Sequence, residues 1–565
     1  MSTVTHDGMR HVTGNRLSTS HDRPEEHPLP NNIIFVTNRG PIEHEFDRRG
    51  HSVAHRGAGG VVTGLISAAE GRNVTWIALA MTDADRIAAR NQKASQHPLS
   101  EAPTLHPVLV SVPQMAYHRY YDGFSNRILW FTQHGMAHTL KISTLRAYWE
   151  DGYKAVNQAV ADKVVDSIRA AGSATPVMFH DYHLYLAPRM VRDRMPQALL
   201  HHFVHIPWPE PRMWERLPRD IVRSIFDGLL ANDTIGMQTQ RDTEHFAAGA
   251  MRYLRGAWVS TSGDAIHWRG HTTVLRAHPI AVTPSSIRAA AHSAPAERKA
   301  AALLRRAGVA QGRKLILRVD RVEPTKNIVR GFRAYERLLR LHPHLHGKVV
   351  FLALLVPSRE TMREYREYSR KVREIIARIN TMYGTDGWEP VIAVYGNDHA
   401  RALACMRQYD VLLVNPLIDG MNLVVKEGGL VNERNGVIVL SDKAGAHAQL
   451  RDGTLGINAR SVVATANALY QALVMPVVRR ARMANWVRIH LQQESAGQWL
   501  TRQLVTLMQT RNHRDTGHTG STGLRITIPH PRIELDALTL NPDRATGGVL
   551  SLALTHGQLN PDQVD

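Results

Sequence analysis

The sequence has almost no cysteine and no long apolar run. Cys405 is the only cysteine among 565 residues, so no disulfide can form within the chain and no thiolate cage can hold a metal. No stretch of 18 consecutive apolar residues occurs, and the first 30 residues lack the apolar core of a signal peptide. We therefore expect a soluble protein of the reducing cytoplasm, without a membrane partner.

Acidic residues are scarce relative to basic ones. The chain has 69 Lys and Arg against 50 Asp and Glu, a formal net charge of +19. This excess favours anionic partners, which include nucleic acid, anionic lipid and phosphorylated metabolites. The densest basic patch near the end, at Arg479, Arg480 and Arg482, has no interleaved aromatic residues or RNA-binding signature. We interpret it as a solvated helical face and expect no nucleic-acid partner.

Patterns that hold metals are also rare. Asp83 and Asp85 have the spacing of a metal-binding DxD, but no further ligand accompanies them, so we expect a solvated acidic loop. The 32 histidines include no HExxH and no paired metal spacing. The sequence predicts no metal site.

Short apolar runs alternate with longer helical patterns along most of the chain. Such alternation is typical of parallel sheets covered by helices on both faces, and a chain of this length exceeds one core. Pro and Ser interrupt the alternation near 278–286, which divides it into two series. We therefore predict an α/β fold with two Rossmann-like doubly wound domains facing a central cleft. The expected strands are 33–38, 74–81, 176–180, 199–204 and 234–239, then 314–319, 348–356, 391–396, 410–414 and 437–440.

The same pattern predicts how the chain is divided. Residues 1–30 are rich in Ser, Thr, His and Pro and are expected to form a flexible leader. The expected divisions after it are an N-terminal domain over 31–280, a C-terminal domain over 281–476, a helical segment over 477–510 that packs back on the fold, and a polar tail over 511–565 with a strand at 524–528.

Polar residues follow the apolar runs of the first series, where ligands of open parallel sheets bind. Arg39 follows the first run, and the glycine-rich loop 56–60 precedes a helical stretch. Such a loop exposes N–H groups to an anion, although a plain tight turn explains it equally well. Asp181 and His205 belong to polar clusters after two consecutive strands, so we expect both clusters to face one crevice.

The second series ends in charged residues of both signs. Arg321 and Lys326 lie five apart across a turn, and they are able to grip one diphosphate from two sides, although a solvated turn is the alternative. A helix beginning near Met421 would direct its free amides toward the cleft beside Asp419, with Glu427 about two turns further on. Carboxylates accept hydrogen bonds from sugar hydroxyls and cations pair with phosphates, so this set of residues suits a sugar nucleotide.

These segments together resemble one known family. NRGP, GAGGVVTGL, YYDGFSNRILW, HDYHL, HIPWP, IGMQT, RVDRVEPTKN, DGMNLVVKE and LSDKAGA occur in the order found in trehalose-6-phosphate synthases, which are retaining glycosyltransferases of the GT-B type in glycosyltransferase family 20. The resemblance runs from about Ile33 to about Thr510. It implies transfer of glucose from GDP-glucose or UDP-glucose to glucose 6-phosphate, forming α,α-trehalose 6-phosphate. The nucleoside diphosphate glucose is a co-substrate, no cofactor is required, and a homo-oligomer is compatible with the resemblance.

The resemblance also implies roles for single residues. The expected acceptor ligands are Arg39, Tyr121, Trp130 and Arg359; the expected catalytic residues are Arg321, Lys326, Asp181 and His205; the expected donor ligands are Gly59, Gly60, Asp419, Gly420, Met421, Asn422, Leu423 and Glu427.

Three departures from the family pattern lie on the nucleotide side and leave the donor base open among GDP, UDP and ADP. Asn327 stands where Gly is frequent, and Asn tolerates the left-handed turn. Gln449 replaces the usual Glu, and Ser461 stands where Asp is usual but still caps the next helix.

Three other functions are alternatives to synthesis of trehalose 6-phosphate. The chain could be a family member with another acceptor, such as glycerol 3-phosphate or a pseudosugar phosphate, a non-catalytic sugar-phosphate sensor, or a nucleic-acid binder.

Overall fold

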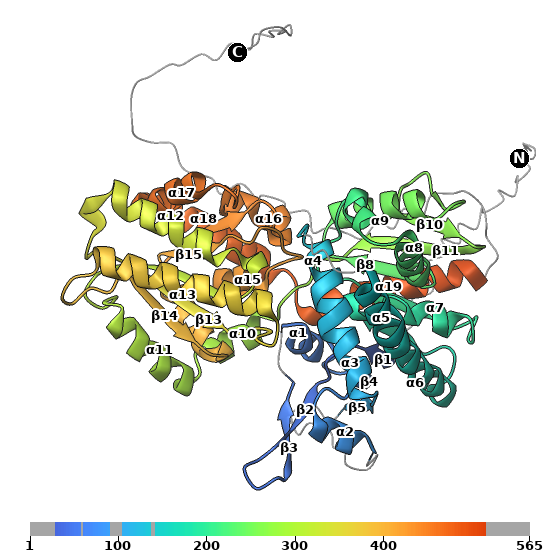
Figure 1. Cartoon of the computed structure of the whole chain (residues 1–565). Coiled ribbons are helices and arrows are strands. Elements are labelled where there is room, and N and C mark those ends of the chain that lie inside the picture. The colour runs from blue at the N-terminus through green and yellow to red at the C-terminus, as the bar shows by residue number, and fades with distance from the viewer. Residues whose placement is uncertain (1–28, 58–59, 91–103, 137–141, 516–565) are drawn as a thin grey trace, which may run out of the picture. The chain divides into compact units, whose positions relative to one another are not determined.

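A computed structural model describes residues 29–57, 60–90, 104–136 and 142–515. These residues contain two large sheets and a small hairpin (Figure 1). All ten predicted strands are present within two residues of their expected bounds. Gly59, the leader as far as residue 28 and the expected strand at 524–528 lie outside the described residues.

The first sheet is parallel through seven strands and continues into two antiparallel strands at one edge. The first parallel strand in the chain lies centrally, with the next two on one side and the remaining four on the other, which is the doubly wound order. The strands, in spatial order, are β5 (Leu105–Val110), β4 (Asn73–Leu79), β1 (Asn32–Val36), β6 (Val177–His180), β7 (Leu200–Phe203), β8 (Thr234–Met237), β11 (His271–Ala277), β10 (Ala265–Trp268) and β9 (Trp258–Val259).

Helices cover both faces of this sheet, and the hairpin β2 (Ile42–Phe46) and β3 (Ser52–Arg56) extends from the end of β1 (Figure 1). Two π-helical segments, η1 (Arg119–Leu129) and η2 (Trp149–Lys154), continue directly into neighbouring helices. The helices are α1 (Gly60–Ala68), α2 (Asp83–Arg90), α3 (Gln114–His118), α4 (Trp130–Gln133), α5 (Ile142–Tyr148), α6 (Ala155–Ala171), α7 (Ala187–Arg192), α8 (Arg219–Leu229) and α9 (Gln240–Tyr253).

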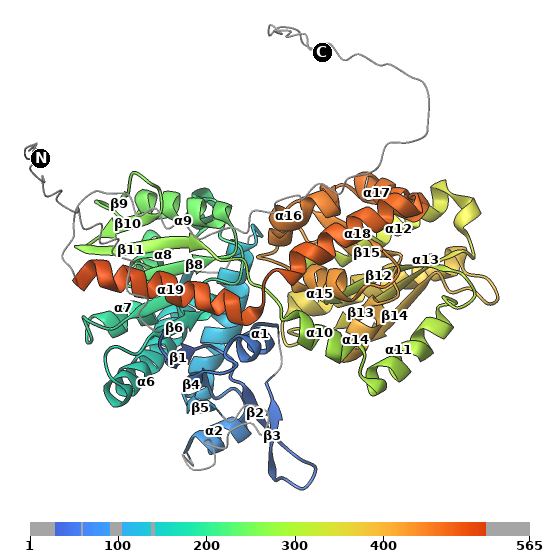
Figure 2. The same cartoon turned by 180° about the vertical axis from the view of Figure 1, so that it is seen from behind.

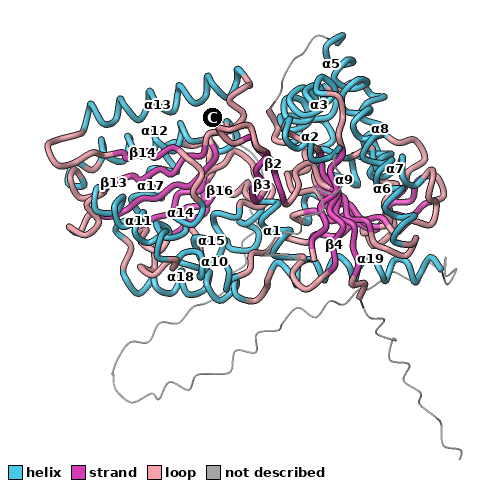
Figure 3. Tube along the Cα trace, turned by 90° about the horizontal axis from the view of Figure 1, so that it is seen from below, coloured by secondary structure: helices cyan, strands magenta, loops and turns pink. Residues whose placement is uncertain are grey.

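The second sheet is parallel throughout and has the strand order 3-2-1-4-5-6 of a dinucleotide-binding fold. Its strands are β14 (Val391–Tyr395), β13 (Val349–Val356), β12 (Lys314–Arg321), β15 (Val411–Val414), β16 (Val437–Ser441) and β17 (Leu455–Ile457). Separate apolar cores lie on its two faces, one under α12 and α13 and one under α11, α14 and α15 (Figure 3). The helices are α10 (Pro284–Ala291), α11 (Ala294–Arg306), α12 (Ile328–Leu341), α13 (Arg363–Tyr383), α14 (His399–Met406), α15 (Leu423–Val431), α16 (Gly445–Leu450) and α17 (Val462–Val474). The predicted fold class is confirmed.

The last two described helices pack on different parts of the fold, one near the second sheet and one near the first. Helix α18 (Val477–Gln492) packs on α15, and α19 (Ala496–Asp515) lies along α1 and β8 of the first sheet (Figure 2). The indole N–H of Trp499 donates to the His278 carbonyl at 2.9 Å, which fixes α19 to the segment that leaves β11. Helical periodicity continued without a break over 477–508 in the sequence, whereas the structure has two helices separated at 493–495.

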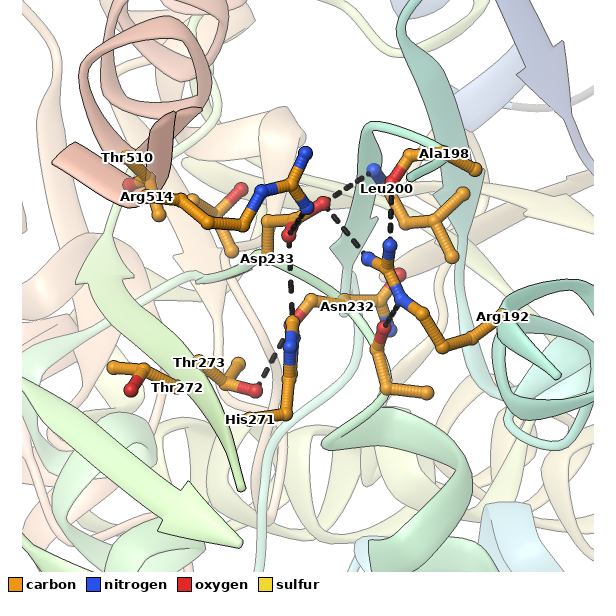
Figure 4. Close-up of polar contacts among 12 residues, drawn as sticks. Arg192, Ala198, Leu200, Asn232, Asp233, His271, Thr272, Thr273, Thr510 and Arg514 are labelled. Atoms are coloured by element: carbon orange, nitrogen blue, oxygen red, sulfur yellow. Dashed lines mark hydrogen bonds and ion pairs between the residues drawn. The ribbon is translucent and has the colours of Figure 1, made fainter. Parts of the chain in front are cut away.

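A buried ion cluster holds the end of α19 (Figure 4). The Asp233 carboxylate, 4% exposed, accepts from the Arg192 guanidinium at 2.9 Å, from Arg514 of α19 at 3.2 Å and from the backbone N–H of Leu200 at 2.8 Å. The His271 imidazole lies 3.9 Å from the same carboxylate. This cluster joins α7, β7, β11 and α19 at an edge of the first sheet.

Three local expectations were wrong. Asp85 is buried in the first turn of α2, where its carboxylate accepts from the N–H groups of His44, Met81 and Thr82. Asp85 therefore belongs to a helix cap rather than to a solvated loop, whereas Asp83 is exposed. Arg480 is buried and donates to the Asn435 carbonyl at 3.2 Å, so it does not belong to a solvated face.

The third wrong expectation concerns the break near 278–286, which is shorter than predicted. Pro284 is the first residue of α10, where the missing N–H of proline costs nothing, and only the residues before it are irregular. Across the described residues, no single helix has the length and apolar character of a membrane span. Helices α17 and α18 meet that description only together, by length and composition, across a bend of 109°.

Candidate active site

Four of the predicted site residues end or follow strands at which the sheets reverse their order. In the first sheet the reversal lies between β1 and β6, and Arg39 and Asp181 follow these two strands. In the second sheet it lies between β12 and β15; Arg321 ends β12 and Asp419 follows β15. Open α/β sheets bind ligands at such points, because the connections there diverge to opposite faces.

A close backbone approach brings the two sets of residues together. A Cβ atom on Gly420 would lie 2.1 Å from the carbonyl oxygen of His205, so only glycine fits at this position. The loop after β15 therefore packs against the chain that leaves β7. Nearby, a Cβ atom on Gly60 would lie 3.8 Å from a methyl group of Leu423, so α1 and α15 begin side by side.

An aromatic and cationic cluster marks the expected acceptor side. The guanidinium carbon of Arg359 lies 4.4 Å from the Trp130 ring centroid, and that of Arg321 lies 5.7 Å from the same ring. Arg359 also donates to the Tyr182 hydroxyl at 3.2 Å. Stacking on an aromatic face fixes the plane of a guanidinium and leaves its N–H fork available to an oxyanion.

Tyr121 and Arg39 belong to the same neighbourhood. The Tyr121 ring stacks on His183, with centroids 5.8 Å apart and planes 12° from parallel. Burial first, and then the charges of Arg359 and Arg39, lower the pKa of His183 well below its usual value. Both cations therefore act on one imidazole, and Arg39 also pairs with Glu43 at 3.2 Å.

Asp181 and His205 meet at the ends of the neighbouring strands β6 and β7. The backbone N–H of His205 donates to the Asp181 carboxylate at 3.3 Å. Burial raises the pKa of Asp181 to about 7, although two backbone hydrogen bonds and the charges of Arg359 and Arg321 oppose the rise. Burial lowers the pKa of His205 to about 3, so its imidazole is neutral at physiological pH. This contact joins the two polar clusters, and that they face one crevice stays a prediction.

On the donor side, a carboxylate holds each expected phosphate-binding cation. The Lys326 ammonium lies 2.5 Å from the Asp419 carboxylate, which also accepts from the Asn422 amide at 3.1 Å. Burial opposes ionisation of both groups, but the charge of Lys326 lowers the pKa of Asp419 and the charge of Asp419 raises the pKa of Lys326. The pair is therefore ionised, and the ammonium has a fixed position.

Arg321 is held in a comparable way by a residue that sequence reasoning did not single out. Its guanidinium lies 3.0 Å from Glu323, whose side chain is fully buried. Burial by itself raises the pKa of Glu323, but Arg321, Arg359 and Lys326 outweigh it and lower the pKa to about 2. Glu323 belongs to the motif that contains Arg321 and Lys326, but its position between two cations concealed its role as a counter-charge.

The other donor residues surround the beginning of α15. This helix begins at Leu423, two residues later than predicted, and Asn422 before it makes no side-chain capping hydrogen bond. The first N–H groups of α15 therefore remain available to an anion. Glu427 lies one turn further and contacts His399 at 3.0 Å, a histidine that carried no signal in the sequence.

Backbone strain is concentrated at this site. Among the described residues six non-glycine residues have a positive φ, and such conformations cost about 1–3 kcal/mol each. Four of them are at the site: Asp181 (71°), Asn327 (58°), Arg359 (49°) and Asn422 (74°). The expected left-handed turn at Asn327 is confirmed, as is the Ser461 cap, whose hydroxyl accepts from the N–H of Ala464 at 3.0 Å.

No group of three or more His, Cys, Asp or Glu able to hold a metal is found within the described ranges. A surface hollow of about 460 Å³ lies at the bend between α17 and α18, but it is lined by none of the predicted site residues.

Two doubly wound sheets with facing sites at both reversal points define a glycosyltransferase of the GT-B type. The sequence model of glycosyltransferase family 20 matches residues 31–509. The chain belongs to this family, the trehalose-6-phosphate synthase family, and is a hexosyltransferase.

Curated relatives agree with this assignment. An α,α-trehalose-phosphate synthase [UDP-forming] of Botryotinia fuckeliana is 30% identical over 81% of this chain and 84% of the relative. The enzyme of that name from Schizosaccharomyces pombe is 32% identical over 65% of this chain and 70% of its own. A bifunctional trehalose-6-phosphate synthase/phosphatase of Thermoproteus tenax is 32% identical over 70% of this chain, which spans about half (52%) of that relative.

A solved structure is similar as well. The α,α-trehalose-phosphate synthase (UDP-forming) from Burkholderia xenovorans, in complex with glucose-6-phosphate, has a TM-score of 0.72 and 26% identity. The similarity covers 84% of this chain and 100% of that one.

Proposed function

We propose that this chain transfers glucose from a nucleoside diphosphate glucose to glucose 6-phosphate, with retention of configuration, and forms α,α-trehalose 6-phosphate. Residues 31–280 carry most of the acceptor groups and 281–476 most of the donor groups, with Arg359 of the second range assigned to the acceptor and Gly59 and Gly60 of the first to the donor. The observation that carries the proposal is the presence of two cation sets at one contact. Arg359 stacks on Trp130 and acts with Arg39 on the His183 imidazole, whereas Arg321 pairs with Glu323 and Lys326 with Asp419. One set fits a sugar phosphate and the other a departing diphosphate.

The acceptor set explains why the acceptor is phosphorylated. Arg359 is held by Trp130 and Tyr182, and the charge of Arg39 acts on the same His183 imidazole as that of Arg359. A phosphate would pair with both cations, whereas an acceptor without one would leave buried positive charge unpaired, which costs binding free energy. Tyr121 supplies a ring surface and a hydroxyl beside this position.

The donor set acts on the leaving group. As the bond between the anomeric carbon and the diphosphate oxygen breaks, negative charge grows on that oxygen, and Arg321 and Lys326 neutralise it. The acceptor hydroxyl attacks the anomeric carbon on the same face, and its proton passes to the departing phosphate oxygen. No enzymic nucleophile enters this sequence, so the protein's contribution is charge placement, orientation and exclusion of water.

The remaining residues orient the two sugars. Asp181 and the neutral His205 provide hydrogen-bonding groups for sugar hydroxyls, Asp419 and the amides that follow it bind the transferred glucose, and Glu427 accepts from the ribose. Gly59 and Gly60 are assigned to the donor because Gly60 lies beside Leu423. The relatives are named UDP-forming, which supports UDP-glucose, and GDP-glucose is the second candidate donor.

A donor-by-acceptor panel with product identification tests the proposal. The purified chain is incubated with UDP-, GDP- or ADP-glucose and with glucose 6-phosphate, glucose or glycerol 3-phosphate, and products are identified by mass spectrometry and NMR. We expect trehalose 6-phosphate from UDP- or GDP-glucose, and glucose at least about a hundredfold less efficient. Equal efficiency with glucose contradicts the phosphate site, higher efficiency with glycerol 3-phosphate indicates another acceptor, and no transfer at all indicates a sensor.

A further inference from the structure

His399 contacts the carboxylate assigned to the donor's ribose. Its Nε2 atom lies 3.0 Å from Oε1 of Glu427. The Glu427 side chain is 12% exposed and that of His399 is 48% exposed, so the imidazole lies on the solvent side of the carboxylate. The contact leaves Oε2 and part of Oε1 available to other donors, because a carboxylate has about four acceptor positions.

The position of His399 is fixed by contacts other than Glu427. It is the first residue of α14, after the cap residue Asp398, whose carboxylate accepts from the N–H of Arg401 at 3.0 Å. The same carboxylate accepts from Lys299 of α11 at 2.9 Å. The imidazole is therefore presented to Glu427 by an anchored helix end.

The pair lies beside the proposed donor site. Glu427 is one turn beyond Leu423, which faces Gly60 at the beginning of α1. The Glu427 hydrogen bond raises the pKa of His399, and the charge of Arg56 opposes that rise.

We propose that His399 is a positioning residue for the nucleoside part of the donor. Its Nε2–H holds Glu427 in one rotamer, with the remaining acceptor positions directed at the two ribose hydroxyls. A carboxylate fixed in advance loses less conformational entropy when the ribose binds. This inference rests on the proposed function, because it requires that Glu427 binds the donor's ribose.

Calorimetric titration with UDP and GDP, and with their 2′,3′-dideoxy analogues, tests the role. We expect His399→Ala to weaken binding of the ribonucleotide about five- to tenfold and to leave the dideoxy analogue unchanged, because that analogue has no hydroxyls for Glu427. His399→Gln, whose amide donates from a comparable reach, should bind within about twofold of wild type. The matched control is His292→Ala, which removes a second His–Glu pair, 3.2 Å from Glu433, outside the site.

Each other result has a distinct meaning. If His399→Ala weakens binding of the ribonucleotide and of the dideoxynucleotide equally, His399 has a structural role and the inference is overturned. The inference is also overturned if His399→Ala leaves ribonucleotide binding unchanged, or if His399→Gln does not restore that binding. If neither UDP nor GDP binds to the wild-type chain, the donor site itself is contradicted, and with it the proposed function.

Discussion

The two halves of the site occupy equivalent positions in two similar sheets, yet they treat charge in opposite ways. At the ends of β6 and β7, burial keeps His205 neutral and raises the pKa of Asp181 to about 7. At the ends of β12 and β15, cations keep Glu323 and Asp419 ionised despite burial. Neutral and weakly charged groups suit sugar hydroxyls, whereas fixed ion pairs suit a diphosphate, so local electrostatics, and not topology, distinguishes the two halves.

Removing a cation from the donor half should have the largest effect. We expect Arg321→Ala or Lys326→Ala to lower kcat by about a hundredfold or more, because the charge they neutralise develops as the leaving group departs. Initial rates of nucleoside diphosphate release measure the effect, and circular dichroism reports folding. Each variant also leaves a carboxylate without its counter-ion, Glu323 in Arg321→Ala and Asp419 in Lys326→Ala, so the folding measurement is required for both.

Arg306→Ala, which removes an exposed arginine from its ion pair with Glu389, is the matched control and should retain activity. Turnover within about threefold of wild type for both Arg321→Ala and Lys326→Ala would mean that the diphosphate does not contact these residues.

The fold was largely predictable because its signal is local. Strands such as β13 are buried on both faces and therefore appear as continuous apolar runs. The missed parallel strands are β5, β11 and β17. Pro107 in β5 and the paired threonines of β11, Thr272 and Thr273, weaken that signal, and β17 is only three residues long.

The site was predictable only where a motif marked it. The residues that hold the catalytic groups in place were missed for two reasons. Glu323 lies inside a motif, but between two cations that drew attention from it, and His399, the partner of Glu427, lies outside every motif and 28 residues away along the chain. Contacts of this kind depend on how elements pack, which spacing alone does not show.

The acceptor half predicts a pH dependence. If ionised Asp181 accepts from the acceptor sugar, kcat/KM should rise with pH through about 7, the pKa to which burial raises this group. Asp181→Asn should lower activity and remove that inflection. The sign for stability is opposite: the folded chain holds this proton more tightly than the unfolded chain, so the contribution of Asp181 to stability falls as pH rises from 3.8 toward about 7.

Rate profiles from pH 5.5 to 8.5 and urea denaturation at the same pH values measure both effects. If an inflection near pH 7 persists in Asp181→Asn, another group causes the inflection. The electrostatic contrast between the two halves of the site would then be contradicted.

A third charged cluster, the one around Asp233, sharpens the comparison because it belongs to neither half. Asp233→Asn leaves the Arg192 guanidinium buried with a neutral partner, and breaking a buried pair in this way costs about 3–5 kcal/mol. Arg514→Ala, which removes a partly exposed partner, should cost less, about 1 kcal/mol or below. Urea denaturation should therefore show a lower midpoint for Asp233→Asn than for Arg514→Ala, while kcat and both KM values of the folded variants stay within about twofold of wild type.

The opposite result would connect the cluster to the site. Arg514 lies on α19, whose other end contacts the segment after β11 through Trp499. If Arg514→Ala loses activity without losing stability, this end of α19 affects the site, and the cluster around Asp233 belongs with the acceptor half.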